Sequence, residues 1–210
     1  AASDVYKRQH WNTTSSVVHQ PYSYSKTVAE QEAWRYQKAQ DRWDMVTIHP
    51  GLVLGPALTK ASDSASLSTM KQFTDGTMLF GAPDLAMGAV DVRDVAGAHL
   101  RAGFTPEAHG RYIVNAQSLT LLEIGKILRR GFGQLYPFPR TTAPKAIVKV
   151  IAPRIGLTRK YVDTNVGYPL KFDNSRSRTE LGLTYRPVEQ TVTEHFQQML
   201  DDGVVRRMPW

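Results

Sequence analysis

The chain has 210 residues, of which 41% are hydrophobic and 21% charged, as is typical of a folded globular protein rather than a disordered one. It contains no cysteine, which excludes disulfides, zinc–thiolate sites and thiol nucleophiles. The formal net charge is +7, and no run approaches the roughly 18 apolar residues of a transmembrane helix, so we expect a cytoplasmic protein with no transmembrane segment.

The first ten residues, 1–10, offer no initiating methionine, no apolar periodicity and no helix cap. We therefore expect a non-native or disordered leader, followed by sequence that begins inside a longer protein. After Pro21, apolar residues at helical spacing predict a helix over 22–40. A β-branched run at 45–48 predicts a strand that stops at His49-Pro50-Gly51, with a loop over 52–56.

The rest of the chain alternates between strand-like and helix-like segments, which predicts an α/β protein. Thr120 and Glu123 have the spacing of a capping box, and Gly203 is a helix stop. Asp91 and Asp94 are expected to cap a helix or pair with Arg93 or Arg101. The expected strands are 89–92 and 111–115, and the expected helices are 67–74, 93–104, 120–130 and 187–202.

Basic residues concentrate between 124 and 172, where ten lysines or arginines accompany a single acid, Asp163. Such a surface attracts acidic substrates, cofactor phosphates, nucleic acids or anionic membranes. The interleaved aromatic residues of a nucleic-acid platform are missing, so we expect no nucleic-acid partner. A solvated basic face is the simplest interpretation. The histidines have no metal-ligand spacing, and no metal site is expected.

Tyr22 and Lys26 stand one helical turn apart, on one face of the first helix and about 6 Å apart along its axis. A lysine ammonium so placed favours the phenolate form of a tyrosine. The pair therefore suits a general acid that protonates a carbonyl oxygen as hydride arrives. An ordinary surface contact has the same spacing, which occurs often by chance. Tyr24 is a rival, but it is only two residues from Lys26, which turns the two side chains apart.

Four motifs in matching order resemble the extended short-chain dehydrogenases/reductases of the NAD-dependent epimerase/dehydratase superfamily, especially the dihydroflavonol reductase and aldehyde reductase branch. They lie at residues 21–30, 48–56, 90–96 and 172–182. The resemblance implies the C-terminal part of a Rossmann-like, doubly wound parallel sheet, with the active-site helix, over 11–116. It implies a small mixed α/β region, mainly for substrate binding, over 117–210.

The resemblance also implies roles for individual residues. Tyr22 would be the general acid/base, and Lys26 would tune it and hold the ribose hydroxyls of the nicotinamide. Pro50, Gly51, Leu52 and Val53 would wrap the nicotinamide ring. The cofactor would be NADP or NAD, and the reaction would reduce a small-molecule carbonyl (an aldehyde, ketone or dihydroflavonol-like compound) to an alcohol.

The chain departs from the family in two respects. It contains no Gly-x-Gly-x-x-Gly or Gly-x-x-Gly-x-x-Gly turn for the cofactor pyrophosphate, and the family's catalytic serine would lie upstream of residue 1. We therefore expect the isolated chain to be inactive, with an unpaired edge on the strand at 45–48. The alternatives that stay open are a nucleotide-sugar epimerase or dehydratase and a non-catalytic binding protein. The oligomeric state is open too.

Overall fold

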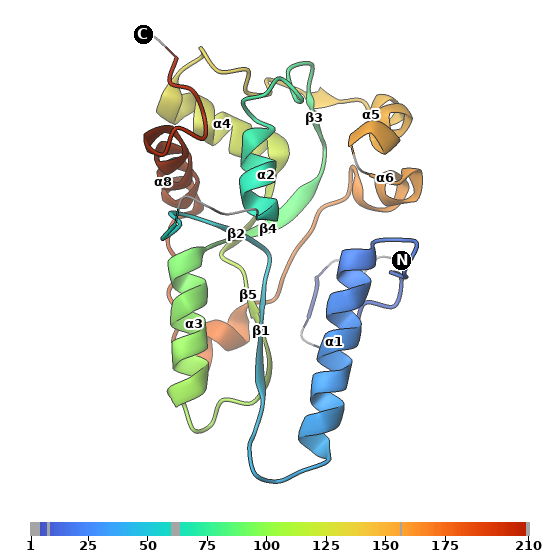
Figure 1. Ribbon diagram of the computed structural model, residues 1–210, viewed down its shortest axis with the longest axis vertical. Coiled ribbons are helices and arrows are strands. Elements are labelled where there is room, and N and C mark those ends of the chain that lie inside the picture. The colour runs from blue at the N-terminus through green and yellow to red at the C-terminus, as the bar shows by residue number, and fades with distance from the viewer. Residues whose placement is uncertain (1–4, 8, 60–63, 156, 209–210) are drawn as a thin grey trace.

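The structure, a computed structural model, describes residues 5–7, 9–59, 64–155 and 157–208. Strands and helices alternate along the chain (Figure 1). The strands are β1 Val46–Pro50, β2 Leu52–Leu54, β3 Ala82–Pro83, β4 Ala86–Asp91, β5 Gly110–Val114, β6 Gln117–Thr120 and β7 Thr142–Ala143. The helices are α1 Pro21–Lys38, α2 Ala65–Lys71, α3 Val92–Phe104, α4 Leu121–Phe132, α5 Lys145–Ile151, the 3-10 helix η1 Ala152–Ile155, α6 Arg159–Asn165, α7 Ser175–Thr179 and α8 Val188–Asp201.

The strands pair mainly in parallel, so the predicted α/β class is confirmed. β1 lies beside β5, with Val46 opposite Gly110 and Pro50 opposite Val114. β4 is the centre of a second sheet, parallel to β2 and antiparallel to β6. β3 and β7 form a third, short parallel pair. Among the described residues β1 pairs with β5 alone, which leaves its other edge open, a feature that sheets normally cover.

The chain bends at Gly51 and changes neighbours there. β1 runs beside β5 as far as Pro50, and from Leu52 onward β2 runs beside β4. The strand stops within His49-Pro50-Gly51, as expected, but the expected loop over 52–56 is wrong in part, because residues 52–54 form β2. Pro50 is tolerated because it ends a strand at the edge of its sheet, and residues 52–54 gain a ladder with β4 that local sequence does not reveal.

The main core lies between the β2–β4–β6 sheet and helices α4 and α8. Phe196 of α8 is fully buried there and packs against the rings of Phe132, Tyr136 and Phe138. A second cluster surrounds buried Tyr112 of β5, beneath α3. A small third cluster joins α5 and α6 around Val148 and Val162. The main core takes residues from both sides of position 116, and the domain boundaries at 10 and 116 stay predictions.

The longer helices agree with expectation to within two residues or so at most ends. Thr120 and Glu123 form the predicted capping box at the start of α4. Gly203, with a φ of 71°, follows the end of α8. The elements that sequence did not reveal, among them β3, β6, β7, α5, α6 and α7, have at most seven residues, too few to set a hydrophobic period.

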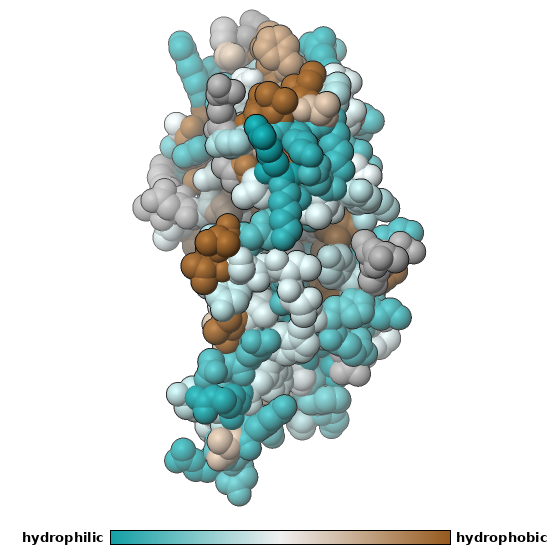
Figure 2. All heavy atoms as spheres, turned by 90° about the vertical axis from the view of Figure 1, so that its right-hand side faces the viewer, coloured by the Kyte–Doolittle hydropathy of each residue, from teal (hydrophilic) through white to brown (hydrophobic). Residues whose placement is uncertain are grey.

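Helix α1 has no buried side chain over its 18 residues. It stands along one side of the molecule next to β1, below α5 and α6 (Figure 1). On that side most of the hydrophobic surface gathers in the upper half, and the lower half is largely hydrophilic or neutral (Figure 2). Apolar burial therefore contributes little to holding α1 in place, and polar contacts must do so.

The N-terminal segment also has contacts. Residues 1–4 and 8, half of the expected leader, lie outside the described residues. Tyr6 forms an isolated bridge with Phe172, and its N–H donates to the carbonyl oxygen of Lys171 at 2.8 Å. Throughout the described ranges, no helix combines the length and the apolar character needed to cross a bilayer.

Candidate active site

Tyr22 and Lys26 lie together on the first turns of α1, as the spacing predicted. The Lys26 ammonium nitrogen is 5.5 Å from the centroid of the Tyr22 ring. Tyr22 is 73% exposed, and among the described residues neither its hydroxyl nor the Lys26 ammonium has a hydrogen-bond or ion-pair partner. The two groups are therefore free to bind a ligand. Their roles in catalysis stay a prediction.

Helix α1 is fastened to the sheet by Glu30, one turn beyond Lys26. Arg111 of β5 holds the Glu30 carboxylate with two hydrogen bonds, from Nε at 2.7 Å and from a terminal nitrogen at 3.0 Å. From β1, the Thr47 hydroxyl donates to it at 3.4 Å and His49 Nε2 lies 3.3 Å away. The indole N–H of Trp34 donates to it at 3.1 Å. One carboxylate thus joins α1, β1 and β5.

The Glu30 carboxylate is charged across the physiological range. Burial opposes the charge, but hydrogen bonds with His49, Arg111 and Trp34 outweigh it and lower the pKa of Glu30 from 4.5 to about 2. A depressed pKa means that the charged form stabilises the fold. That contribution is complete above pH 4.5 and is lost as the pH falls toward 2.

The Glu30 contact determines how far along the direction of β1 Tyr22 and Lys26 lie. The two elements run in opposite directions (Figure 1), so residues earlier in α1 lie farther along the strand. Lys26 and Tyr22 are about 6 and 12 Å from Glu30 along the helix. At about 3.3 Å per strand residue, the level of Tyr22 is nearly four residues beyond the contact with Thr47 and His49. Tyr22 therefore comes level with residues 51–53.

Gly51 makes the bend between β1 and β2, and only glycine fits it. Its N–H donates to the side-chain oxygen of buried Asn115 at 2.9 Å. A Cβ at Gly51 would collide with that oxygen and with the backbone carbonyl of Gly88 in β4. The side-chain amide of Asn174 donates to the backbone oxygen of Asn115 at 2.6 Å and so helps to fix the position of Asn115. The bend is thus fixed at the carboxyl end of the parallel pair, where ligands of α/β sheets bind.

Replacing Gly51 by alanine is expected to destabilise the protein by about 2 kcal/mol, because the added methyl group must displace backbone as well as a side chain. Gly97, in α3, is the matched control, since a Cβ there meets nothing within 4 Å. Gly97→Ala should stabilise the helix by up to about 1 kcal/mol. Urea unfolding of both variants measures the difference, and equal effects would show that the bend is not tightly packed.

Two carboxylates at the start of α3 hold neighbouring elements together. Asp91 caps α3 and forms an ion pair with Arg93, as predicted, and it also accepts a hydrogen bond from Thr191 of α8 at 2.9 Å. Asp94 pairs with Arg186 and not with Arg101, because the segment before α8 passes over the start of α3. Within the described part of the chain, no three His, Asp or Glu side chains are grouped to hold a metal ion.

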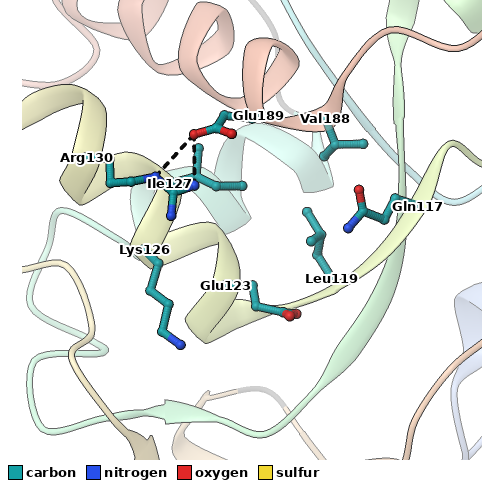
Figure 3. A pocket seen from close by; sticks show the side chains of 8 residues that line it. All are labelled: Gln117, Leu119, Glu123, Lys126, Ile127, Arg130, Val188 and Glu189. Atoms are coloured by element: carbon teal, nitrogen blue, oxygen red, sulfur yellow. Dashed lines mark hydrogen bonds and ion pairs between the residues drawn. The ribbon is translucent and has the colours of Figure 1, made fainter.

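A pocket of about 220 Å³ opens between β6, α4 and α8, and its floor is apolar (Figure 3). Across its rim Arg130 pairs with Glu189 at 2.8 Å, and Glu123 is used in the cap of α4. A second pocket, of about 290 Å³, lies near Trp11, Trp34 and Arg111. Neither Tyr22 nor Lys26 lines either pocket, so the candidate site is an open surface in this chain.

The structure thus brings Tyr22 and Lys26 together, and the rises of the helix and the strand put Tyr22 level with residues 51–53. Glu30 and Asn115 position this site, although sequence reasoning assigned neither of them a role. Glu30 had a detectable signal, because it continues the stripe of Tyr22 and Lys26 at intervals of four residues. Asn115 had none, since it meets Gly51 across 64 residues of sequence.

Comparison with known proteins gives consistent matches. The model of the NAD dependent epimerase/dehydratase family matches residues 4–116. Cinnamoyl-CoA reductase 2 of Arabidopsis thaliana is 31% identical over 182 residues, which cover 87% of this chain and 48% of the relative. NADPH-dependent methylglyoxal reductase of Saccharomyces cerevisiae is 27% identical over 198 residues, 90% of this chain and 54% of the relative. The chain therefore spans about half the length of these relatives.

Solved structures share the fold. Vestitone reductase from alfalfa (Medicago sativa) has a TM-score of 0.71 at 16% identity, with 98% of this chain and 61% of that chain covered. The Gre2 protein of Candida albicans has a TM-score of 0.69 at 24% identity, with 96% and 60% covered. At these identities the likeness concerns the fold alone, and it agrees with the Rossmann-like α/β architecture expected from the motifs.

Proposed function

The chain belongs to the NAD dependent epimerase/dehydratase family, and from that membership we propose that it carries the proton-transfer half of an NADPH-dependent carbonyl reductase. The observation that carries the proposal is the pairing of a free Tyr22 hydroxyl with the Lys26 ammonium, 5.5 Å from the ring centroid. The relatives add support, because those described above are named as reductases, one of them NADPH-dependent.

The proposed reaction reduces an aldehyde or ketone to an alcohol. NADPH, when bound, supplies the hydride. Tyr22 donates its hydroxyl proton to the carbonyl oxygen, and the Lys26 cation stabilises the phenolate that remains. Lys26 also has donors to spare for the ribose hydroxyls of the nicotinamide. The backbone from Pro50 to Val53 would bound the nicotinamide ring, a proposal that the rises of the helix and the strand support.

The residues present fit the nicotinamide end of the cofactor. The free donors of Tyr22 and Lys26, and the tightly packed bend at Gly51, have the chemistry that a ribose and a flat ring require. For the pyrophosphate the chain has no glycine-rich turn. We therefore propose that the isolated chain does not turn over substrate and that activity requires a chain with the length of the relatives.

A nucleotide-sugar epimerase or dehydratase is the second candidate. A nucleoside-diphosphate-sugar epimerase of Pseudomonas aeruginosa shares the fold with a TM-score of 0.67 at 17% identity, and an epimerase of the same superfamily would use the same tyrosine–lysine pair. Assay of a chain extended to the length of the relatives separates the two candidates. A reductase oxidises NADPH stoichiometrically with an added aldehyde, and an epimerase consumes none.

Weak cofactor binding by the isolated chain is a direct prediction. Titration with NADPH, followed by nucleotide fluorescence, should show no saturation in the micromolar range. The reason is that the chain has no glycine-rich turn at a helix N-terminus to bind the pyrophosphate. The chain extended to the length of the relatives is the positive control. Micromolar binding by the isolated chain would contradict the proposal that these residues hold only the nicotinamide end.

A further inference from the structure

We infer that Glu30 is a positioning residue. Its contacts with β1 and β5 fix the position of Tyr22 and Lys26, along the direction of β1, relative to the bend at residues 50–53. The inference deepens the proposed function and rests on it for the roles of Tyr22 and Lys26. The position itself is a geometric property of the chain and does not depend on any activity.

The first step is that α1 has little apolar packing to hold it. None of its side chains is fully buried, with Thr27 and Trp34 among those that are partly buried, and its N-cap residue, Gln20, is in the left-handed conformation and makes no side-chain cap. Just before it, His19 lies 3.5 Å from the Thr158 hydroxyl, at the limit of a hydrogen bond. A helix attached so lightly can slide or turn unless one strong contact holds it.

Glu30 supplies that contact from a protected position. Its side chain is 12% exposed and that of Arg111 is 17% exposed, and their closest atoms are 2.7 Å apart. Both carboxylate oxygens are bound, so the helix cannot rotate about a single bond. Arg111 is itself stacked on Trp11, 4.3 Å from the ring centroid, and is therefore a stiff partner.

The second step is the direction in which the contact acts. Tyr22, Lys26 and Glu30 are spaced by four residues, so they share one stripe of α1. Because α1 and β1 run in opposite directions, the contact of Glu30 with Thr47 and His49 places Lys26 and Tyr22 nearer the carboxyl end of β1. A displacement of about 1 Å at such a site can cost a hundred-fold in rate, so the contact matters for chemistry beyond stability.

The chain offers a matched control on the same helix. Glu32 lies on the outer face and, within the described ranges, pairs only with Arg35, in an ion pair whose side chains are 52% and 61% exposed. Glu32→Ala and Glu30→Ala thus remove the same group from the same helix, and only the second removes a contact with the sheet.

Paramagnetic relaxation measures this position without any assay of activity. The chain has no cysteine, so Ser25→Cys, on the exposed surface of α1, gives a single site for a spin label. We expect the label to broaden the amide signals of Gly51, Leu52 and Val53. Glu30→Ala should abolish most of that broadening while the α1 signals stay helical, and Glu32→Ala should leave it unchanged. Glu30→Gln keeps the shape of the side chain but not its charge, and it should lose an intermediate part of the broadening. If Glu30→Ala unfolds α1, Glu30→Gln is the variant that tests the inference.

Unchanged broadening in Glu30→Ala, or an equal loss in Glu32→Ala, would overturn the inference. In the chain extended to the relatives' length, Glu30→Ala should lower kcat about ten- to hundred-fold with KM little changed. If no extended chain, wild type included, reduces a carbonyl, the proposed function fails. The relaxation experiment still tests the role of Glu30 in that case, so the two failures can be told apart.

Discussion

Replacing Tyr22 by phenylalanine is expected to lower the rate of carbonyl reduction at least about a hundred-fold, since a positioned general acid contributes roughly 10²–10⁴ in rate. The substitution removes the hydroxyl and keeps the ring beside Lys26. The loss should therefore fall on kcat, with KM for the aldehyde little changed. The measurement is NADPH oxidation with aromatic aldehydes, in a chain extended to the length of the relatives.

Tyr24→Phe is the matched control for this experiment. Tyr24 lies on the same turn but two residues from Lys26, and it should keep nearly full activity after losing its hydroxyl. A Tyr22→Phe enzyme with wild-type turnover would exclude Tyr22 as the proton donor. An inactive Tyr24→Phe enzyme beside an active Tyr22→Phe enzyme would transfer the role to Tyr24.

The second large effect concerns the junction of β4, α3 and α8. The Asp91 carboxylate is completely buried and is neutralised by Arg93, which also reaches Glu194 of α8 at 2.6 Å. Of the partners that the described residues give Asp91, Arg93→Met would leave the Thr191 hydroxyl and a backbone N–H. Because an uncompensated buried charge is costly, the variant should lose about 3 kcal/mol of the free energy of unfolding at neutral pH.

Arg130→Met is the control, because Arg130 makes the same kind of pair with Glu189 on the surface, where the two side chains are 62% and 61% exposed. It should cost less than about 1 kcal/mol. Urea unfolding of both variants tests the difference. Equal losses would mean that the Asp91 charge is not isolated from solvent.

The acid dependence of the Arg93 variant has a definite sign. In the wild type burial opposes the charge of Asp91, but hydrogen bonds from Arg93 and Thr191 outweigh it and hold the pKa below its usual 3.8. The charge therefore stabilises the wild type above pH 3.8, and this contribution is lost as the pH falls. Without Arg93, burial makes the charged form of Asp91 unfavourable, and protonation of Asp91 removes this free-energy cost. The stability difference between wild type and variant should narrow in acid.

Features carried by short stretches of sequence could be predicted. The long helices follow from apolar spacing, and the capping box of α4 follows from Thr120 and Glu123, three residues apart. The pairing of Tyr22 with Lys26 follows from the pitch of one helix, because i and i+4 face the same way whatever the helix packs against. The family resemblance likewise depends on motifs that are each about ten residues long.

Features that depend on distant residues could not be predicted. The strand β2 exists because β4 lies beside it, and local sequence offered only glycine and proline as signs of a loop. Asp94 meets Arg186 across 92 residues rather than the nearby Arg101. In each case the local pattern was compatible with another outcome, and packing against a distant segment selected the one observed.

The sequence by itself determined that this is an α/β chain with a tyrosine and a lysine on one helical face, because both properties depend on repeats of a few residues. Only the tertiary structure decided where that helical face lies relative to the sheet. Along the helix Glu30 bonds with Trp34, and it becomes an anchor to the sheet because β1 and β5 bring Thr47 and Arg111 side by side. A contact between segments 81 residues apart is set by how the sheet folds, and no local period encodes it.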